Sequence, residues 1–219
     1  MALMTAPEVL ELLEPEYGPV KWSPRYDPAS ELVYTILSQH TSDINSTRAF
    51  NNLIRTFGDL DSISKASVHE IEDSIRMGGL ARMKAPRIKA ILNQIKDELG
   101  SYDLSFLAEI PLSEAKVWLK RIQGIGPKTA AIILCFSLGL PAMPVDTHIY
   151  RVSKRIGLIG EKVTAEQAHD LLEPLVVPED VFPFHMYLIY HGRKVCKAQR
   201  PRCENCVLSH KCPSKASFI

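Results

Sequence analysis

The stretch from residue 119 to residue 149 constrains the fold more than any other part of the chain. Apolar residues recur at helical spacing from Leu112 to Ile122, and an apolar run of helical length ends at Leu138. Between them lies Gly124-Ile125-Gly126-Pro127, in which both glycines allow positive φ and the proline suits the first position of a helix. The pattern predicts a helix, a tight hairpin and a second helix. The N–H groups of such a hairpin can bind a phosphate, although a plain turn also explains the glycines.

Two ionisable residues in the same stretch indicate chemistry. Lys128 falls in the first turn of the second helix, where the positive end of the helix dipole disfavours an ammonium and favours a nucleophilic amine. Asp146 opens a helix expected over 147–157. The alternative interpretations are a solvated or phosphate-binding lysine and a helix-capping aspartate. The two roles of Asp146 are compatible, since a capping aspartate can also take part in chemistry.

Four of the five cysteines form a cluster near the end of the sequence. Cys196, Cys203, Cys206 and Cys212 are spaced C-x6-C-x2-C-x5-C, and the first residues of the chain lack the basic segment of a secretory signal. Clustered thiols in an intracellular chain indicate a metal site rather than disulfides. Both zinc and an iron–sulfur cluster accept four thiolates. Cys135, inside an apolar run, is expected to be a buried core thiol.

The apolar pattern predicts an all-α fold. Hydrophobic residues make up 46% of the 219 residues, which suffices for one large domain or two lobes, and no run is long enough to cross a membrane. We find helical spacing but no strand alternation. Helices are expected over 7–13, 29–39, 44–57, from Pro86 to Gly100, and over 181–195, with Pro15 opening a loop, Asp43 as an N-cap, and capping boxes at Ser67/Glu70 and Thr164/Gln167.

The net charge of +1 conceals an asymmetry. Residues 1–115 contain 11 Lys/Arg and 17 Asp/Glu, a balance of −6, whereas residues 116–219 contain 15 and 8, a balance of +7. The basic half includes the hairpin and the cysteines, which indicates a surface that faces nucleic acid. A chance asymmetry on a solvated surface is the alternative.

Together these motifs resemble those of a known family. Gly124-Ile-Gly-Pro-Lys-Thr-Ala130, Val145-Asp-Thr-His148 and the cysteine spacing resemble the endonuclease III family of helix-hairpin-helix/Gly-Pro-Asp DNA glycosylases, over nearly the whole chain. The resemblance implies a six-helix lobe at 21–140, a discontinuous lobe formed by 1–20 and 141–219, and a DNA-binding cleft between them. It also implies a [4Fe–4S] cluster on the four cysteines. The partner would be double-stranded DNA with damaged bases or abasic sites, bound by a monomer in the cytoplasm at the nucleoid.

The resemblance also assigns roles to individual residues. Lys128 would be the nucleophile and Asp146 its assisting carboxylate. Leu37-Ser-Gln-His-Thr-Ser-Asp43 matches the family segment Leu-Ser-Ala-Gln-Ala-Thr-Asp, so His40 replaces a gap-filling glutamine, and Leu80 matches a leucine wedge. The opposite-base preference therefore does not carry over. The DNA-binding set expected in addition to His40 and Leu80 is Gln39, Gly124, Gly126, Thr129, His148, Arg193, Lys197, Arg200 and Arg202.

The activity implied is that of a bifunctional DNA N-glycosylase and abasic-site lyase that removes oxidised pyrimidines. One alternative is a glycosylase for mismatched thymine or uracil, or for 5-methylcytosine. Another is a non-catalytic DNA-binding redox module. The adenine-mismatch branch uses an extra carboxylate in the helix before Gln39, where this chain has Thr35, Ile36 and Leu37, so that reaction is not expected.

Overall fold

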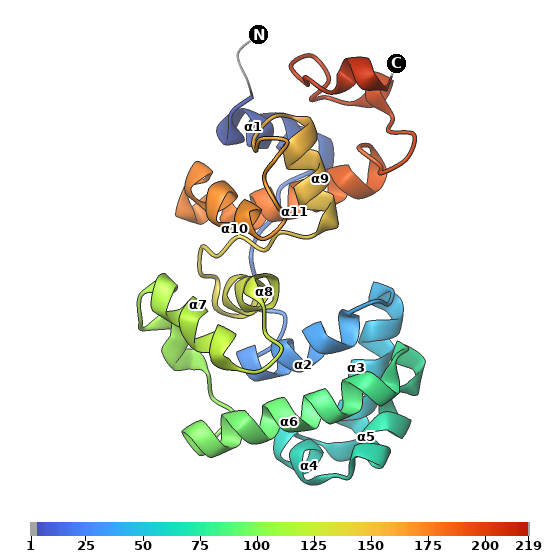
Figure 1. Ribbon diagram of the computed structural model, residues 1–219, viewed down its shortest axis with the longest axis vertical. Coiled ribbons are helices and arrows are strands. Elements are labelled where there is room, and N and C mark those ends of the chain that lie inside the picture. Colours follow the sequence, from blue (N-terminus) through green and yellow to red (C-terminus); the bar gives the residue numbers. More distant parts are fainter. Residues whose placement is uncertain (1–3, 219) are drawn as a thin grey trace. The chain divides into compact units, whose positions relative to one another are not determined.

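The computed structural model describes residues 4–218, and no strand occurs among them (Figure 1). The predicted all-α fold is confirmed. By its internal contacts the chain divides into two compact units. We call Pro24–Thr129 the hairpin unit, and Met1–Ser23 together with Ala130–Ile219 the cysteine unit. This division falls within a helix, ten or so residues before the lobe boundary expected at residue 140.

The hairpin unit contains six complete α-helices among its described residues and the start of a seventh. They are α2 (Pro28–Ser38), α3 (Asp43–Phe57), α4 (Leu60–Lys65), α5 (Val68–Ile75), α6 (Ala81–Leu99), α7 (Leu112–Arg121) and the beginning of α8 (Pro127–Leu138), with short 3-10 turns η1 (Arg76–Gly78) and η2 (Ser105–Ala108). Leu32, Ile36, Leu53, Ile71 and Ile88 are fully buried and form the centre of the unit. The helices therefore pack on one apolar core, which fixes the loops between them.

Local signals explain most of these helix boundaries. The Asp27 side chain accepts from the N–H groups of Ala29 and Ser30 at the start of α2. The predicted capping box of Ser67 and Glu70 is present at α5. The N-cap predicted at Asp43 is wrong, because Ser42 caps α3 and Asp43 is its first residue.

Two proline-based predictions also fail. The long helix begins at Ala81, five residues before Pro86, and α1 continues through Pro15 to Tyr17. A proline inside a helix costs one backbone hydrogen bond, and burial of the neighbouring apolar residues offsets this loss. Ala85 and Ile88 are fully buried beside Pro86, as is Leu13 beside Pro15.

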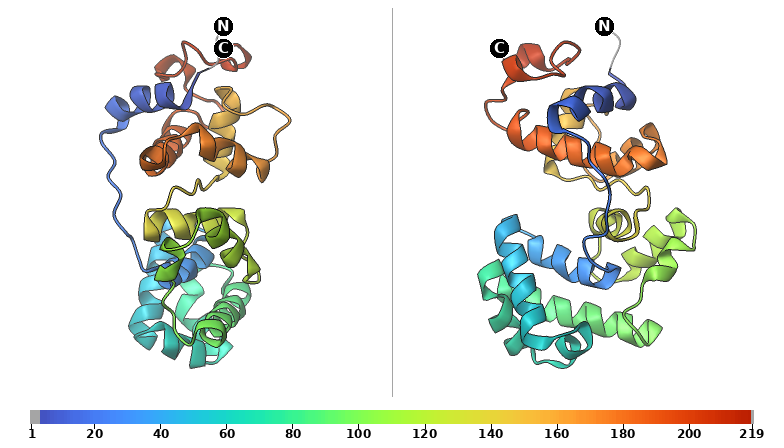
Figure 2. Two further views of the ribbon diagram at one scale, coloured as in Figure 1. Left: turned by 90° about the vertical axis from the view of Figure 1, so that its left-hand side faces the viewer. Right: turned by 180° about the vertical axis from the view of Figure 1, so that it is seen from behind.

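The cysteine unit is built around three helices that pack side by side. Its elements are α1 (Ala6–Tyr17), most of α8, α9 (Thr147–Arg155), α10 (Gln167–Leu172), α11 (Val181–Lys194), and the 3-10 turns η3 (Glu173–Leu175), η4 (Pro178–Asp180), η5 (Cys203–Asn205) and η6 (Lys215–Ser217). Helix α11 lies against both α1 and α9, as both views in Figure 2 show. The two hydrogen bonds expected between Thr164 and Gln167 are present just before α10.

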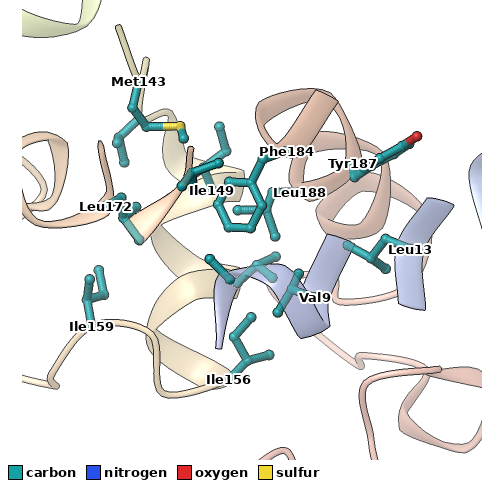
Figure 3. Packing of buried hydrophobic residues seen from close by; sticks show 14 of the residues in the cluster. Val9, Leu13, Met143, Ile149, Ile156, Ile159, Leu172, Phe184, Tyr187 and Leu188 are labelled. Carbon is teal, nitrogen blue, oxygen red and sulfur yellow. The ribbon is translucent and has the colours of Figure 1, made fainter. Parts of the chain in front are cut away.

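The core of the cysteine unit lies between α1, α9 and α11. Val9 and Leu13 from α1, Ile149 from α9, and Phe184 and Leu188 from α11 meet there and are fully buried (Figure 3). This apolar contact fixes α9 against α11 and so sets the position of the residue that opens α9. No helix in the described part of the chain is both long and apolar enough to span a membrane.

Candidate active site and nucleic-acid interface

The connection between α7 and α8 is a tight hairpin, as predicted. The N–H of Ile125 donates to the carbonyl oxygen of Ile122 at 3.0 Å, and the Ile125 side chain is buried. Gly124 has φ +84°, which explains the first glycine. Gly126 does not have a positive φ, so that reason for the second glycine is wrong. A Cβ added to Gly126 would meet no atom within 4 Å, so its exposed backbone leaves room for a ligand to approach closely.

Helix α8 begins at Pro127, so Lys128 is its second residue, as predicted. The Lys128 side chain is exposed, and it stands beside the unpaired N–H groups of the first helical turn. Thr129, the third residue, is only 7% exposed. Because its side chain is buried, Thr129 can contact an anion only through its backbone N–H.

Asp146 is the N-cap of α9. Its Oδ1 accepts from the N–H groups of His148 and Ile149, both at 2.8 Å, and the residue is half-buried. Within the part of the chain that the structure describes, Oδ2 accepts no hydrogen bond. The capping interpretation is therefore confirmed, and one carboxylate oxygen remains available for chemistry.

The start of α9 is fixed to the end of α11 by a close approach and a bridging arginine. A Cβ added to Gly192 would lie 2.9 Å from the Cβ of His148. The Nη2 atom of Arg151 lies 2.8 Å from the Gly192 carbonyl oxygen and 3.2 Å from Nδ1 of His148, and its Nε donates to the carbonyl of Cys196 at 3.0 Å. His148 therefore holds the Asp146 cap against α11, a role separate from the DNA contact expected of it.

Gln39 and His40 follow α2 and differ in their surroundings. The side-chain oxygen of Gln39 accepts from Nη1 of Arg87 at 2.9 Å. His40 has φ +54° and is exposed. Because Gln39 is tied to Arg87, His40 is the residue of this pair that the loop presents to solvent.

Leu80 stands at the end of a Gly-Gly turn. A Cβ on Gly78 would lie 2.9 Å from the Cβ of Ala49, so this glycine permits a close approach, and Gly79 has φ +67°. Leu80 itself has φ +53° and is 48% exposed. A leucine in this conformation pays a backbone cost and buries only part of its side chain, so Leu80 contributes little to the stability of the fold.

Three non-glycine residues in the described part of the chain have a positive φ: His40, Leu80 and Arg200. All three belong to the DNA-binding set expected from the sequence. A residue in this region costs about 1–3 kcal/mol and persists where surrounding structure holds it, most often at functional sites. Backbone strain and sequence motif thus single out the same three positions.

The four clustered cysteines line one cavity, together with Arg155 and His191. Burial raises the pKa of Cys206 to about 11 and also raises that of Cys212, and the side chain of Cys196 is buried. No three His, Cys, Asp or Glu side chains between residues 4 and 218 converge closely enough to hold a single metal ion. All four cysteines expected to bind a metal therefore face the same cavity.

Cys135, by contrast, is a core thiol, as predicted. It is 1% exposed, and burial raises its pKa to about 12. It lies in α8, outside the set that lines the cysteine cavity.

The basic loop after Cys196 is held by backbone contacts that leave its cations exposed. Arg155 donates to the carbonyl oxygens of Lys197 at 2.6 Å and Ala198 at 3.0 Å, and its Nη1 lies 3.5 Å from the Cys196 sulfur. Arg200 and Arg202 are exposed on this loop, as is Arg193 at the end of α11, whereas Lys197 is half-buried. The loop thus has the form of a fixed, positively charged surface.

Comparison with known proteins agrees with this geometry. The family model of the HhH-GPD superfamily of base excision DNA repair proteins matches residues 33–178. Endonuclease III of Sulfolobus acidocaldarius is 35% identical over 183 residues, which cover 83% of this chain and 79% of the relative. Endonuclease III of Thermotoga maritima is 34% identical over 187 residues, covering 85% and 83%.

The chain belongs to the endonuclease III family.

A solved structure of an endonuclease III trapped as a covalent intermediate with DNA superposes on this family member with a TM-score of 0.83. The sequences are 26% identical, and the match covers 98% of this chain and 99% of the other. The resemblance inferred from the hairpin and cysteine motifs is therefore confirmed at the level of family and fold.

The structure of this endonuclease III family member also reveals four cations that the motifs did not indicate: Lys84, Arg87, Arg151 and Arg155. Each donates hydrogen bonds to backbone carbonyl groups of a segment that includes an expected site residue or lies next to one. Since every residue has a carbonyl group, the sequence contains no signal for such partners. The two proposed catalytic residues lie in different units. Lys128 belongs to the hairpin unit and Asp146 to the cysteine unit, and the contacts described above hold each residue within its own unit.

Proposed function

We propose that the protein is a bifunctional DNA N-glycosylase and abasic-site lyase of base excision repair, which removes oxidised pyrimidines from double-stranded DNA. The observation that carries the proposal is the exposed Lys128 in the first turn of α8, directly after an open Gly-x-Gly hairpin, in a member of the endonuclease III family. A lysine amine can form a covalent Schiff base with a sugar carbon. The related endonuclease III has been trapped covalently on DNA, which supports this assignment.

The chemistry proposed for Lys128 proceeds in two stages. The neutral amine attacks C1′ of the damaged nucleotide, and the base departs with the electron pair of the glycosidic bond and gains a proton. Opening of the sugar ring leaves a protonated Schiff base between Nζ and C1′. Loss of a proton from C2′ then expels the 3′ phosphate, which nicks the strand on the 3′ side of the lesion, and hydrolysis frees the lysine.

Asp146 is proposed to assist the first stage. Its Oδ1 is occupied by the α9 cap, so Oδ2 is the oxygen that can accept the lysine proton or stabilise positive charge on the sugar. The cap fixes the carboxylate, and contact of His148 with Gly192 fixes the helix that carries it.

Reaction at C1′ requires the damaged nucleotide to leave the base stack. We propose that His40 and Leu80 occupy the space it vacates. Both side chains are exposed on left-handed backbone, and Gln39, the other candidate, is bonded to Arg87. Gly124 and Gly126 would bind a phosphate, and Arg193, Lys197, Arg200 and Arg202 would bind others.

Cys196, Cys203, Cys206 and Cys212 are proposed to hold a [4Fe–4S] cluster. The arrangement of their thiols around one cavity supports this assignment. Bound there, the cluster would supply four bonds that fix the fold of the basic loop, since metal binding couples to local folding. We further propose that the protein acts as a monomer on chromosomal DNA inside the cell.

A panel of lesion duplexes tests the proposed function. Purified protein is incubated with duplexes containing thymine glycol, dihydrouracil, a U:G or T:G mismatch, or an abasic site, and base release and strand nicking are measured separately. We expect release of thymine glycol and dihydrouracil, and nicking of the abasic duplex by β-elimination. Release from U:G or T:G alone would replace the oxidised-pyrimidine assignment with a mismatch glycosylase, and binding without release or nicking would refute an enzyme.

A further inference from the structure

The buried ammonium of Lys84 joins the two segments that present His40 and Leu80. Lys84 lies on α6 and is 4% exposed. Its Nζ donates to the carbonyl oxygen of Leu37 at 2.7 Å and to that of Gly78 at 3.0 Å. Leu37 is three residues before His40, and Gly78 is two residues before Leu80. One cation therefore bonds to both segments, at the end of α2 and in η1, shortly before each enters the left-handed region.

The bonding of this lysine is unusual for a buried charge. No described carboxylate pairs with Lys84, and burial lowers its pKa. The Leu37 carbonyl is among the last of α2, at the negative end of that helix, where a cation is favoured. Burying a charge is costly when no opposite charge pairs with it, and here two carbonyl groups offset only part of that cost. An apolar side chain of similar length would fill the same space without that cost.

Arg87, one turn further along α6, makes a second bridge. Its Nη1 donates to the side-chain oxygen of Gln39, and its Nη2 donates to the carbonyl oxygen of Gly124 in the hairpin. The guanidinium occupies the space that a Cβ on Gly124 would need, with Nε 2.9 Å from that point. Helix α6, which lies against α2 and α5 (Figure 1), thus links the His40 segment, the Leu80 segment and the hairpin.

We propose that Lys84 is a positioning residue for base extrusion, which fixes the spacing of His40 and Leu80 so that both enter the vacated space in one step. The inference rests on the proposed function, since it takes these two side chains to fill the gap. Lys84 touches neither the base nor the sugar. It acts through backbone carbonyls, and Arg87 supports it by fixing Gln39 and the hairpin against the same helix.

Two single-turnover rates test the proposal. One is base release from the lesion duplex that the protein prefers, and the other is nicking of a duplex with a preformed abasic site, which has no base to extrude. Lys84→Met removes the ammonium and keeps an unbranched side chain. We expect base release to fall on the order of ten- to a hundredfold, because misplacement by about 1 Å can cost that much. Abasic-site nicking should fall less than about threefold, since the placement of Lys128 is unchanged.

The same helix offers a matched control. Lys89 also donates its ammonium to a backbone carbonyl, that of Ala66, from a partly buried position on α6. That carbonyl belongs to the C-cap of α4, away from His40 and Leu80 in the chain. Lys89→Met should therefore leave the ratio of base release to nicking unchanged, as should any variant that acts through general loss of stability.

Two further variants keep the proposal testable if Lys84→Met does not fold. Lys84→Gln retains an amide donor and should recover part of the base release that Lys84→Met loses. Arg87→Met should lower both rates, because Arg87 also bonds to Gly124 in the hairpin, but it should lower base release more than nicking. In the double variant with His40→Ala, Lys84→Met should add little to the loss that His40→Ala causes alone, because both act on one step.

The possible results separate this inference from the proposed function. If the unaltered protein releases no base and nicks no abasic site, the proposed function fails and the inference fails with it. If the unaltered protein does both, while the Lys84 and Arg87 variants change the two rates equally or not at all, this inference alone is overturned. Full additivity of Lys84→Met and His40→Ala would also overturn it.

Discussion

Gly192 of α11 lies so close to His148 of α9 that a Cβ on the glycine would be 2.9 Å from the histidine Cβ. Real Cβ atoms do not approach at that distance, so any side chain at position 192 forces α9 away from α11. The Asp146 cap is attached to the start of α9, and Arg151 extends the same contact to the Cys196 carbonyl. A single small residue thus sets the position of the proposed catalytic carboxylate.

Gly192→Ala should destabilise the protein by about 1–3 kcal/mol, the usual cost of overpacking, even though alanine is the better helix former. Thermal unfolding measures the effect. Gly160→Ala is the control, because its Cβ would meet only Val163 Cγ2 at 3.8 Å, an ordinary contact. Equal melting temperatures for the two variants would contradict this prediction, since they would show that α9 and α11 can move apart at little cost in free energy.

His40→Ala should slow base release much more than nicking of a preformed abasic site, because the imidazole is expected to fill the gap left by an extruded base. The same two single-turnover rates provide the measurement. His69→Ala is the control, since His69 is an exposed histidine of α5 in the same unit, paired with Asp73. A His40→Ala variant that behaves like His69→Ala would mean that His40 is a plain surface residue.

Arg200→Ala and Arg202→Ala should each reduce the salt dependence of DNA binding by about one unit if each arginine meets one phosphate. Binding constants measured across a series of salt concentrations give the slope. Lys162→Ala removes an exposed cation outside the expected DNA-binding set and should leave the slope unchanged. Arginine variants whose slopes match that of the unaltered protein would exclude the basic loop from the interface.

Cys203→Ser should lose iron and, with it, the order of the basic loop and much of the DNA affinity, because cluster binding and loop folding are coupled. Elemental analysis of anaerobically purified protein measures the iron, and visible absorption reports the cluster. Cys135→Ala removes a buried thiol outside the cavity and should keep a full cluster. Finding zinc and no iron in the unaltered protein would refute the cluster.

The sequence predicted those features that depend on local chemistry. The hairpin, the start of α8 at Pro127, the capping box at Ser67 and the cap at Asp146 each follow from residues within a few positions of one another. The helix start predicted at Pro86 was wrong because α6 continues through this proline. The burial that stabilises α6 there depends on residues distant in the chain, which local patterns do not show.

Tertiary features were not predictable in the same way. The left-handed backbone of His40 and Leu80 could not be predicted from the residue types, since most histidines and nearly all leucines have a negative φ. No motif in the sequence indicates Lys84 or Arg87, because their partners include backbone carbonyl groups, which every residue has. The hydrogen bonds of Lys84 and Arg87 to these segments can therefore be identified only from the structure.

The account depends most on Lys128, and borohydride trapping on abasic DNA tests it most directly. A Schiff base requires a primary amine, so the unaltered protein should yield a covalent protein–DNA adduct after reduction, and Lys128→Gln should yield none. DNA affinity should stay within several-fold, because the hairpin N–H groups remain. Asp146→Asn, which still caps α9, should slow base release by about a hundredfold or more while the fold is kept. An adduct of undiminished yield with Lys128→Gln would show that another amine is the nucleophile and would contradict the central assignment.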